Sequence, residues 1–191
     1  MLSTALVAIA AVIFPPLATL GDELFAAHMA QHLLLIAVAA PLLAAARPAP
    51  VDPVWAWLAF VTTFLFWHWP AAFQWAAARE VTTLLEFATI LGTAYLFWSA
   101  VLGGTLSYGA RALMAMTAAV ATDLPGVIMV FAPRAICTMP GENALRWGLT
   151  PLEDQQIAGM LMWVPANLVF FGIATWLFAR WIGADHKPVI S

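Results

Sequence analysis

The feature that most limits the fold of this chain is a series of six apolar stretches, separated by short polar, glycine-containing or proline-rich segments. A helix crosses a bilayer with about 20 apolar residues and satisfies its own backbone groups without water. We therefore expect an all-α integral membrane bundle of about six transmembrane helices, formed as a single domain by residues 1–191. The expected spans are residues 2–20, 24–46, 54–70, 81–102, 111–132 and 155–182.

The composition agrees with a membrane protein. Of the 191 residues, 64% are hydrophobic and 9% are charged, whereas a soluble domain has about 25% charged residues. Ten Trp and 12 Phe against two Tyr are typical of aromatic anchors at the membrane interface. No basic tract indicates nucleic-acid binding, and the single cysteine, Cys137, excludes an intrachain disulfide. The first stretch lacks a basic leading segment, so we expect it to be retained as a membrane helix.

Three of the four histidines border or enter the apolar stretches. His28 and His32 are spaced i, i+4 and share one face of the second expected helix, while His68 ends the third. Ionisable groups in lipid are costly and mark functional sites. Two or three imidazoles suit copper or zinc, and a low coordination number favours Cu(I). We therefore predict a copper site at His28, His32 and His68. The alternatives are that His28 is solvated at the interface and that His32 binds a backbone carbonyl.

Polar residues from distant segments converge on one leaflet if the helices alternate in direction. His28 and His32 begin the second helix, His68 ends the third, Glu86 begins the fourth and Asp154 begins the sixth. With an inside N-terminus, the inner ends carry Arg47, Arg111, Arg180 and Lys187, and the outer loops carry Arg79, Arg134 and Arg146. This small excess of inner cations places the expected metal site at the outer, periplasmic side of a bacterial inner membrane.

Three acidic residues are candidates for a supporting role. Glu86 can orient a histidine by accepting its hydrogen bond, or it can donate a hydrogen bond to another helix when protonated. Asp123 precedes Pro125 and either helps repair the helix break or handles a proton or metal ion. Asp154 is well placed to cap the last helix, because an acid complements the helix dipole there.

Amide and sulfur side chains are further candidates. Gln155, Met160 and Met162 belong to the last helix, and thioethers bind Cu(I), although most membrane methionines only pack. Cys137 and Met139 stand two residues apart in the longest loop and are candidate entry ligands for copper. The alternative is that a lone cysteine in a loop is incidental.

The sequence contains no catalytic Ser/His/Asp order, phosphate-binding loop or HExxH helix, so nothing requires an enzyme. Besides a copper-binding assembly protein, two other functions remain open. In a b-type haem protein, His32 and His68 would be the axial ligands. In a copper transporter, the path would continue through Asp123, Met114, Met116 and Met129. An apolar surface in lipid also permits a homodimer.

The motifs resemble those of the CtaG-type cytochrome c oxidase assembly factors, which are multi-spanning bacterial membrane proteins. The matching segments are His28-Met-x-Gln-His-Leu-Leu-Leu35, Ala40-Pro-Leu-Leu43, Trp67-His-x-Pro70, Phe97-Trp98, Leu106-Ser-Tyr108 and Asp154-Gln-Gln-x-Ala-Gly-x-x-Met-Trp163. The resemblance covers roughly residues 24 to 180. It implies a role in maturing a haem-copper oxidase through copper handling, with oxidase subunits or a periplasmic copper donor as partners. Thr83 and Phe87 stand where the family leads us to expect histidines, and family members are often longer at the N-terminus.

Overall fold

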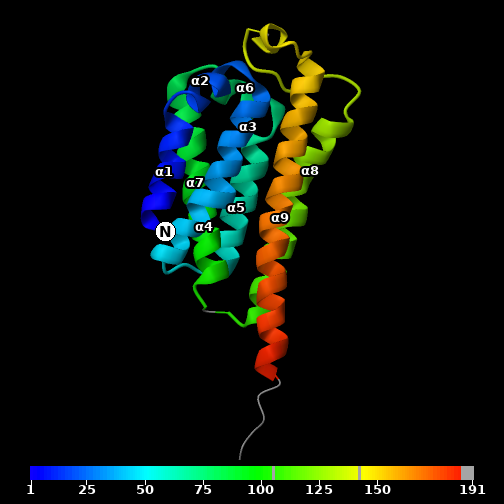
Figure 1. Ribbon diagram of the computed structural model, residues 1–191. Helices are drawn as coiled ribbons and strands as arrows, with labels where there is room; N and C mark the ends of the chain where they lie inside the picture. The colour runs from blue at the N-terminus through cyan, green and yellow to red at the C-terminus, as the bar shows by residue number, and fades with distance from the viewer. Residues whose placement is uncertain (105, 142, 186–191) are drawn as a thin grey trace, which may run out of the picture.

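The structure, a computed structural model, describes residues 1–104, 106–141 and 143–185 (Figure 1). These residues form helices and connecting loops, with no strand among them. The elements in chain order are α1 Leu2–Ile13, α2 Leu17–Glu23, α3 Phe25–Leu33, the π-helix η1 Leu34–Ala39, α4 Ala40–Ala46, α5 Pro53–Trp67, α6 Pro70–Ala77, α7 Glu80–Leu102, α8 Tyr108–Phe131, the 3-10 helix η2 Asn143–Trp147 and α9 Pro151–Asp185.

The apolar helices confirm the predicted membrane bundle. Four helical segments are long and apolar enough to cross a membrane, and they are Phe25–Ala46, Glu80–Leu102, Tyr108–Phe131 and Pro151–Gly183. The pair α1 and α2 bends by 43° around Pro15-Pro16 and makes a fifth span if the pair counts as one. The expected first span, residues 2–20, is therefore a broken helix, because closely spaced prolines cannot continue an α-helix.

The expected third span, residues 54–70, is shorter in the structure. α5 has 15 residues, which makes it about 22 Å long against a hydrocarbon core of about 30 Å. It ends at Trp67, with His68 as its C-cap, because Trp69 precedes a proline and takes an extended conformation. Pro70 then begins α6.

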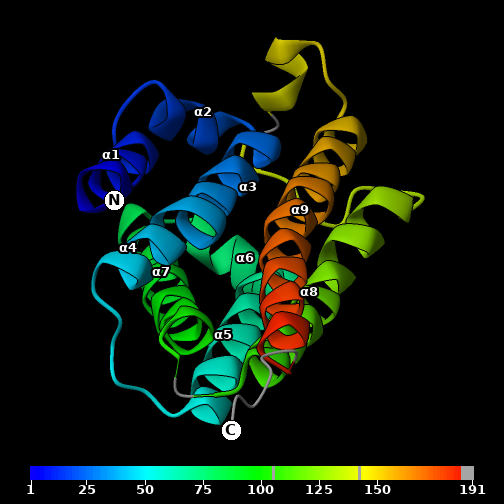
Figure 2. The same cartoon turned by 60° about the horizontal axis from the view of Figure 1, so that its bottom comes forward.

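α8 and α9 lie side by side along one side of the bundle, while α1, α3, α4, α5 and α7 form the rest (Figures 1 and 2). The approach of these two helices depends on two glycines. A Cβ added to Gly159 would stand 2.8 Å from the backbone oxygen of Gly126, so a larger residue does not fit without movement. α9 also packs on α3, the helix that carries two of the histidines.

The π-helix η1 begins two residues after His32 and connects α3 to α4. Pro41 has no N–H, so the carbonyl of Ala37 lacks its normal α-helical donor. Trp98 of α7 donates from Nε1 to the carbonyl of Ile36 within η1 at 2.7 Å. π-segments are frequent at functional sites, and this one is attached to α7, the helix that carries Glu86.

Arg111 lies at the end of the bundle opposite the histidines. Arg111 is buried and donates to the carbonyls of Val101 and Leu102, at the C-terminus of α7. A cation is favourable at this end of a helix because it complements the dipole. Lys187, which was counted with the inner cations, lies outside the described residues.

Candidate metal centre

Three helices bring the histidines together. α3 carries His28 and His32 one turn apart, His68 follows the last residue of α5, and α7 carries Glu86 in its second turn. All four side chains are buried, with exposed fractions of 5% or less. The predicted convergence of distant polar residues at one end of the bundle is therefore present in the structure.

The Glu86 carboxylate lies against both imidazoles of α3. Its Oε2 is 3.2 Å from His28 Nε2, and its Oε1 is 3.4 Å from His32 Nε2. One ligand atom from each of these three residues lies within 4.8 Å of the other two. Carboxylates are almost never fully buried without a partner. Glu86, which the sequence suggested as a supporting residue, is therefore at the centre of the cluster.

His68 contacts the other nitrogen of His32. His68 Nε2 is 3.4 Å from His32 Nδ1, and His68 Nδ1 is 2.6 Å from the backbone oxygen of Phe64. A carbonyl only accepts, so His68 Nδ1 carries the hydrogen. In a neutral His68, Nε2 is then an acceptor, and His32 donates to it from Nδ1. This leaves His32 Nε2 with a free lone pair that faces Glu86.

The hydrogen-bond pattern therefore places two acceptors face to face. His32 Nε2 and Glu86 Oε1 are near enough for an ion pair, but neither has a hydrogen-bond partner among the described residues. An unpaired buried polar group is costly, because the low local dielectric strengthens the penalty. A proton or a metal cation between the two atoms would remove this conflict.

Aromatic side chains enclose the cluster. The Phe87 ring is 5.2 Å from the His28 ring and 5.6 Å from the His32 ring, and Phe64 stacks on His68 at 4.0 Å, all measured between centroids. Phe87 thus occupies one of the positions at which the family resemblance led us to expect histidine. Apolar walls of this kind limit access of water and strengthen electrostatic interactions inside the site.

Asp154 caps a different helix from the one we expected. Its two carboxylate oxygens accept from the backbone nitrogens of Phe25 and Ala26, at 2.8 and 2.9 Å, in the first turn of α3. The start of α9 is instead closed by a capping box, in which Thr150 and Glu153 exchange side-chain and backbone hydrogen bonds. Asp154 therefore supports the histidine helix across the bundle.

Gln155 holds the loop between α8 and α9. Its Nε2 donates to the carbonyl of Met129 at 3.0 Å, and its Oε1 accepts from the backbone nitrogen of Cys137 at 2.9 Å. The Met129 carbonyl needs this donor because Pro133, four residues later, has no N–H. Gln155 thus has a structural role in the described contacts.

The sulfur ligand candidates lie in different places. Met162 is buried and lines a small cavity together with His32, whereas Met160 is 47% exposed. Cys137 and Met139 are both buried. Cys137 lines an apolar cavity that His68 also lines, and Met139 lines a separate cavity. Burial raises the pKa of the Cys137 thiol to about 11.

Asp123 pairs with a neighbouring helix rather than repairing the break at Pro125. Both of its carboxylate oxygens accept from Asn167 Nδ2 of α9, at 2.9 and 3.1 Å. The helix α8 continues through Pro125 to Phe131. An interhelical pair of this kind stabilises the contact between α8 and α9.

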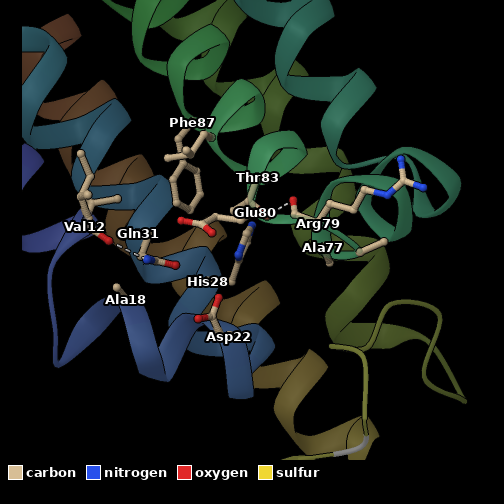
Figure 3. Close-up of a pocket in the computed structure, with 13 residues that line it drawn as sticks. Val12, Ala18, Asp22, His28, Gln31, Ala77, Arg79, Glu80, Thr83 and Phe87 are labelled. Atoms are coloured by element: carbon tan, nitrogen blue, oxygen red, sulfur yellow. Dashed lines mark hydrogen bonds between the residues drawn. The ribbon is translucent and has the colours of Figure 1, made fainter.

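Sequence reasoning did not single out Gln31, which lies between the two histidines of α3. Its side chain is buried, its Nε2 donates to the carbonyl of Val12 at 2.8 Å, and its Oε1 has no partner among the described residues. Figure 3 shows Gln31 and His28 lining the same cavity. The sequence did contain a signal for Gln31, because a polar residue within an apolar membrane helix usually marks a functional position.

The fold and the cluster define a class of protein, namely a multi-spanning helical membrane protein with a buried histidine–glutamate site. The chain matches the family described as "Cytochrome c oxidase caa3 assembly factor (Caa3_CtaG)" over residues 2–52 and 50–184, and it belongs to that family. This confirms the resemblance drawn from the motifs. Neither the curated proteins nor the solved structures gave a match. A family of assembly factors favours a non-catalytic role.

Proposed function

We propose that this protein binds a copper ion at His28, His32 and Glu86 and supplies it to a haem-copper oxidase during assembly. The observation that carries this proposal is the facing pair of His32 Nε2 and Glu86 Oε1, two buried atoms 3.4 Å apart that have no hydrogen-bond partner in the described part of the chain. A cation bound between them satisfies both. Membership of an oxidase assembly family supports copper as the cargo.

The donor set fits a borderline metal ion. Two imidazole nitrogens suit copper, and the carboxylate oxygen of Glu86 favours Cu(II) over the Cu(I) expected from histidines alone. A shell of three protein ligands is also suited to a site that must release its metal. In this proposal His68 orients His32, because its hydrogen bond to Nδ1 leaves Nε2 free to bind the ion.

The b-type haem alternative is less well supported. It requires an iron atom and a porphyrin between the rings of His32 and His68, whose nitrogens are in contact at 3.4 Å. Phe64 stacks on His68, and Phe87 packs against His32. The transporter alternative needs a polar path through the opposite leaflet, but Met116 is 45% exposed and Asp123 is engaged by Asn167.

We propose the outer side of a bacterial inner membrane as the location of the site. The charge bias of the loops supports this orientation. The partners would be subunits of the oxidase and a periplasmic copper donor, and the copper would reach the oxidase by ligand exchange at the membrane surface.

The test is metal analysis of detergent-purified protein loaded separately with Cu(I) and Cu(II). About one copper per chain is expected in the wild type, with loss of the bound copper in the His32→Ala and Glu86→Gln variants. The matched control is Glu153→Gln, which removes a carboxylate at the start of α9, outside the cluster. Copper binding that survives both cluster substitutions, or no copper in the wild type, would contradict the proposal.

A further inference from the structure

The cavity that Gln31 and His28 line lies next to the cluster. It has a volume of about 380 Å³ and lies between α1, α2, α3 and the corner at which α6 meets α7 (Figure 3). His28 lines this cavity and also contacts Glu86 through Nε2. One imidazole therefore connects the cavity to the buried cluster.

Gln31 lines this cavity and carries an unsatisfied oxygen, Oε1, which lies against Gly21 of α2. Its side chain is 3% exposed, and its amide nitrogen is held by the carbonyl of Val12 at 2.8 Å. This bond turns Oε1 away from Val12 and toward the side on which His28 lies (Figure 3). Oε1 has no partner among the described residues, and an unpaired acceptor in a buried place is unfavourable. A cation or its bound water would satisfy this oxygen.

Two exposed carboxylates stand at the same cavity. Asp22 and Glu80 both line it, and Figure 3 shows their carboxylates turned toward it while the guanidinium of Arg79 points away. Asp22 lies in the last turn of α2, where the helix dipole disfavours an acid, so helix stability does not explain its position. Acidic side chains at a low-dielectric cleft raise the local concentration of cations.

We propose that this cavity is a loading site for a hydrated divalent metal cation, which is held by Asp22, Glu80 and Gln31 and then passed through His28 to the cluster. The inference rests on the proposed function. Carboxylate and amide oxygens are harder donors than imidazole, so the loading site suits Cu(II) better than Cu(I). In the transfer an unprotonated nitrogen of His28 replaces a bound water, the water leaves through the cavity, and the ion keeps its oxidation state.

The test compares Cu(II) uptake by full-length protein in detergent with that of the double variant Asp22→Asn/Glu80→Gln. The wild type should retain one tightly bound ion after desalting, and it should bind a second ion weakly only while Cu(II) is in excess. The double variant should lose the weak site and fill the tight site about tenfold more slowly, with a smaller dependence on salt. The matched control, Asp52→Asn/Glu153→Gln, removes the same charge at two residues that cap helices. Asn and Gln can still accept the capping hydrogen bonds, so this variant should load like the wild type.

Loading by the double variant at the wild-type rate, or retention of its weak site, would overturn the loading site. A failure of the proposed function would look different: the wild type would show no tight copper site that depends on His32. In that case equilibrium binding at the weak site still decides the inference. Weak binding that Asp22→Asn/Glu80→Gln abolishes supports the cavity, and weak binding that persists rejects it.

Discussion

The Asp154 carboxylate on α9 accepts a hydrogen bond from the backbone nitrogen of Phe25 on α3, 2.8 Å away and 129 residues apart in the chain. The first backbone N–H groups of a helix have no partner within that helix. Here the partner comes from another span, so the position of α3 is tied directly to the position of α9. His28 and His32 follow within the next two turns, and the cap therefore fixes the helix that presents them.

Removal of this cap should loosen the histidine helix. We expect Asp154→Ala to lower the free energy of unfolding by about 1–2 kcal/mol, because two backbone N–H groups of α3 lose their acceptor. Asp154→Asn should retain part of this stability, because the amide still has one oxygen acceptor. Denaturant titration in detergent measures both. Equal stability of the alanine variant and the wild type would show that the cap contributes nothing.

His68 should affect copper affinity without changing the number of copper ions bound. Its hydrogen bond orients His32 from the side opposite Glu86. We expect His68→Ala to bind one copper per chain with affinity reduced about 10- to 100-fold, as is typical when a residue that orients a ligand is removed. Competition with a chelator gives the affinity. Complete loss of copper would instead make His68 a direct ligand, as the sequence pattern predicts.

The contact between α8 and α9 should not tolerate a side chain at Gly159. A Cβ there would meet the oxygen of Gly126 at 2.8 Å and the Cβ of Met129 at 3.0 Å. We expect Gly159→Ala to destabilise the protein by about 1–3 kcal/mol through overpacking. Gly172→Ala is the control, because no atom of the residues that the structure describes lies within 4 Å of its added Cβ. If the two variants unfold at the same denaturant concentration, the close approach is not required for stability.

Cys137 should react slowly with thiol reagents. Its pKa is raised to about 11 by burial, so about one thiol in a thousand is ionised at pH 8, against about one in four for an ordinary cysteine. The alkylation rate of folded protein should rise about tenfold per pH unit between pH 8 and 10. The same protein unfolded in detergent serves as the control. Rapid alkylation of folded protein at pH 8 would contradict a buried, protonated thiol.

The sequence predicted the membrane bundle and most of its helices, because length and hydrophobicity are local properties of a segment. Its errors lie at prolines. The residues around Pro15-Pro16 and Pro70 divide stretches that are continuous in hydrophobicity, and the sequence does not state whether a proline bends a span or ends it. The interhelical pairing of Asp123 with Asn167 was also not predictable, because it joins residues 44 positions apart.

The sequence by itself determined that His28 and His32 share a helix face, since their spacing follows the helical period, and that they meet His68, Glu86 and Asp154 at one end. Only the tertiary structure decided which atoms touch. It brought Glu86 against the Nε2 atoms of both α3 histidines, put His68 on the Nδ1 side of His32, and used Asp154 to cap α3. These contacts depend on the rotation and depth of each helix, and close packing such as that of Gly126 against Gly159 sets both.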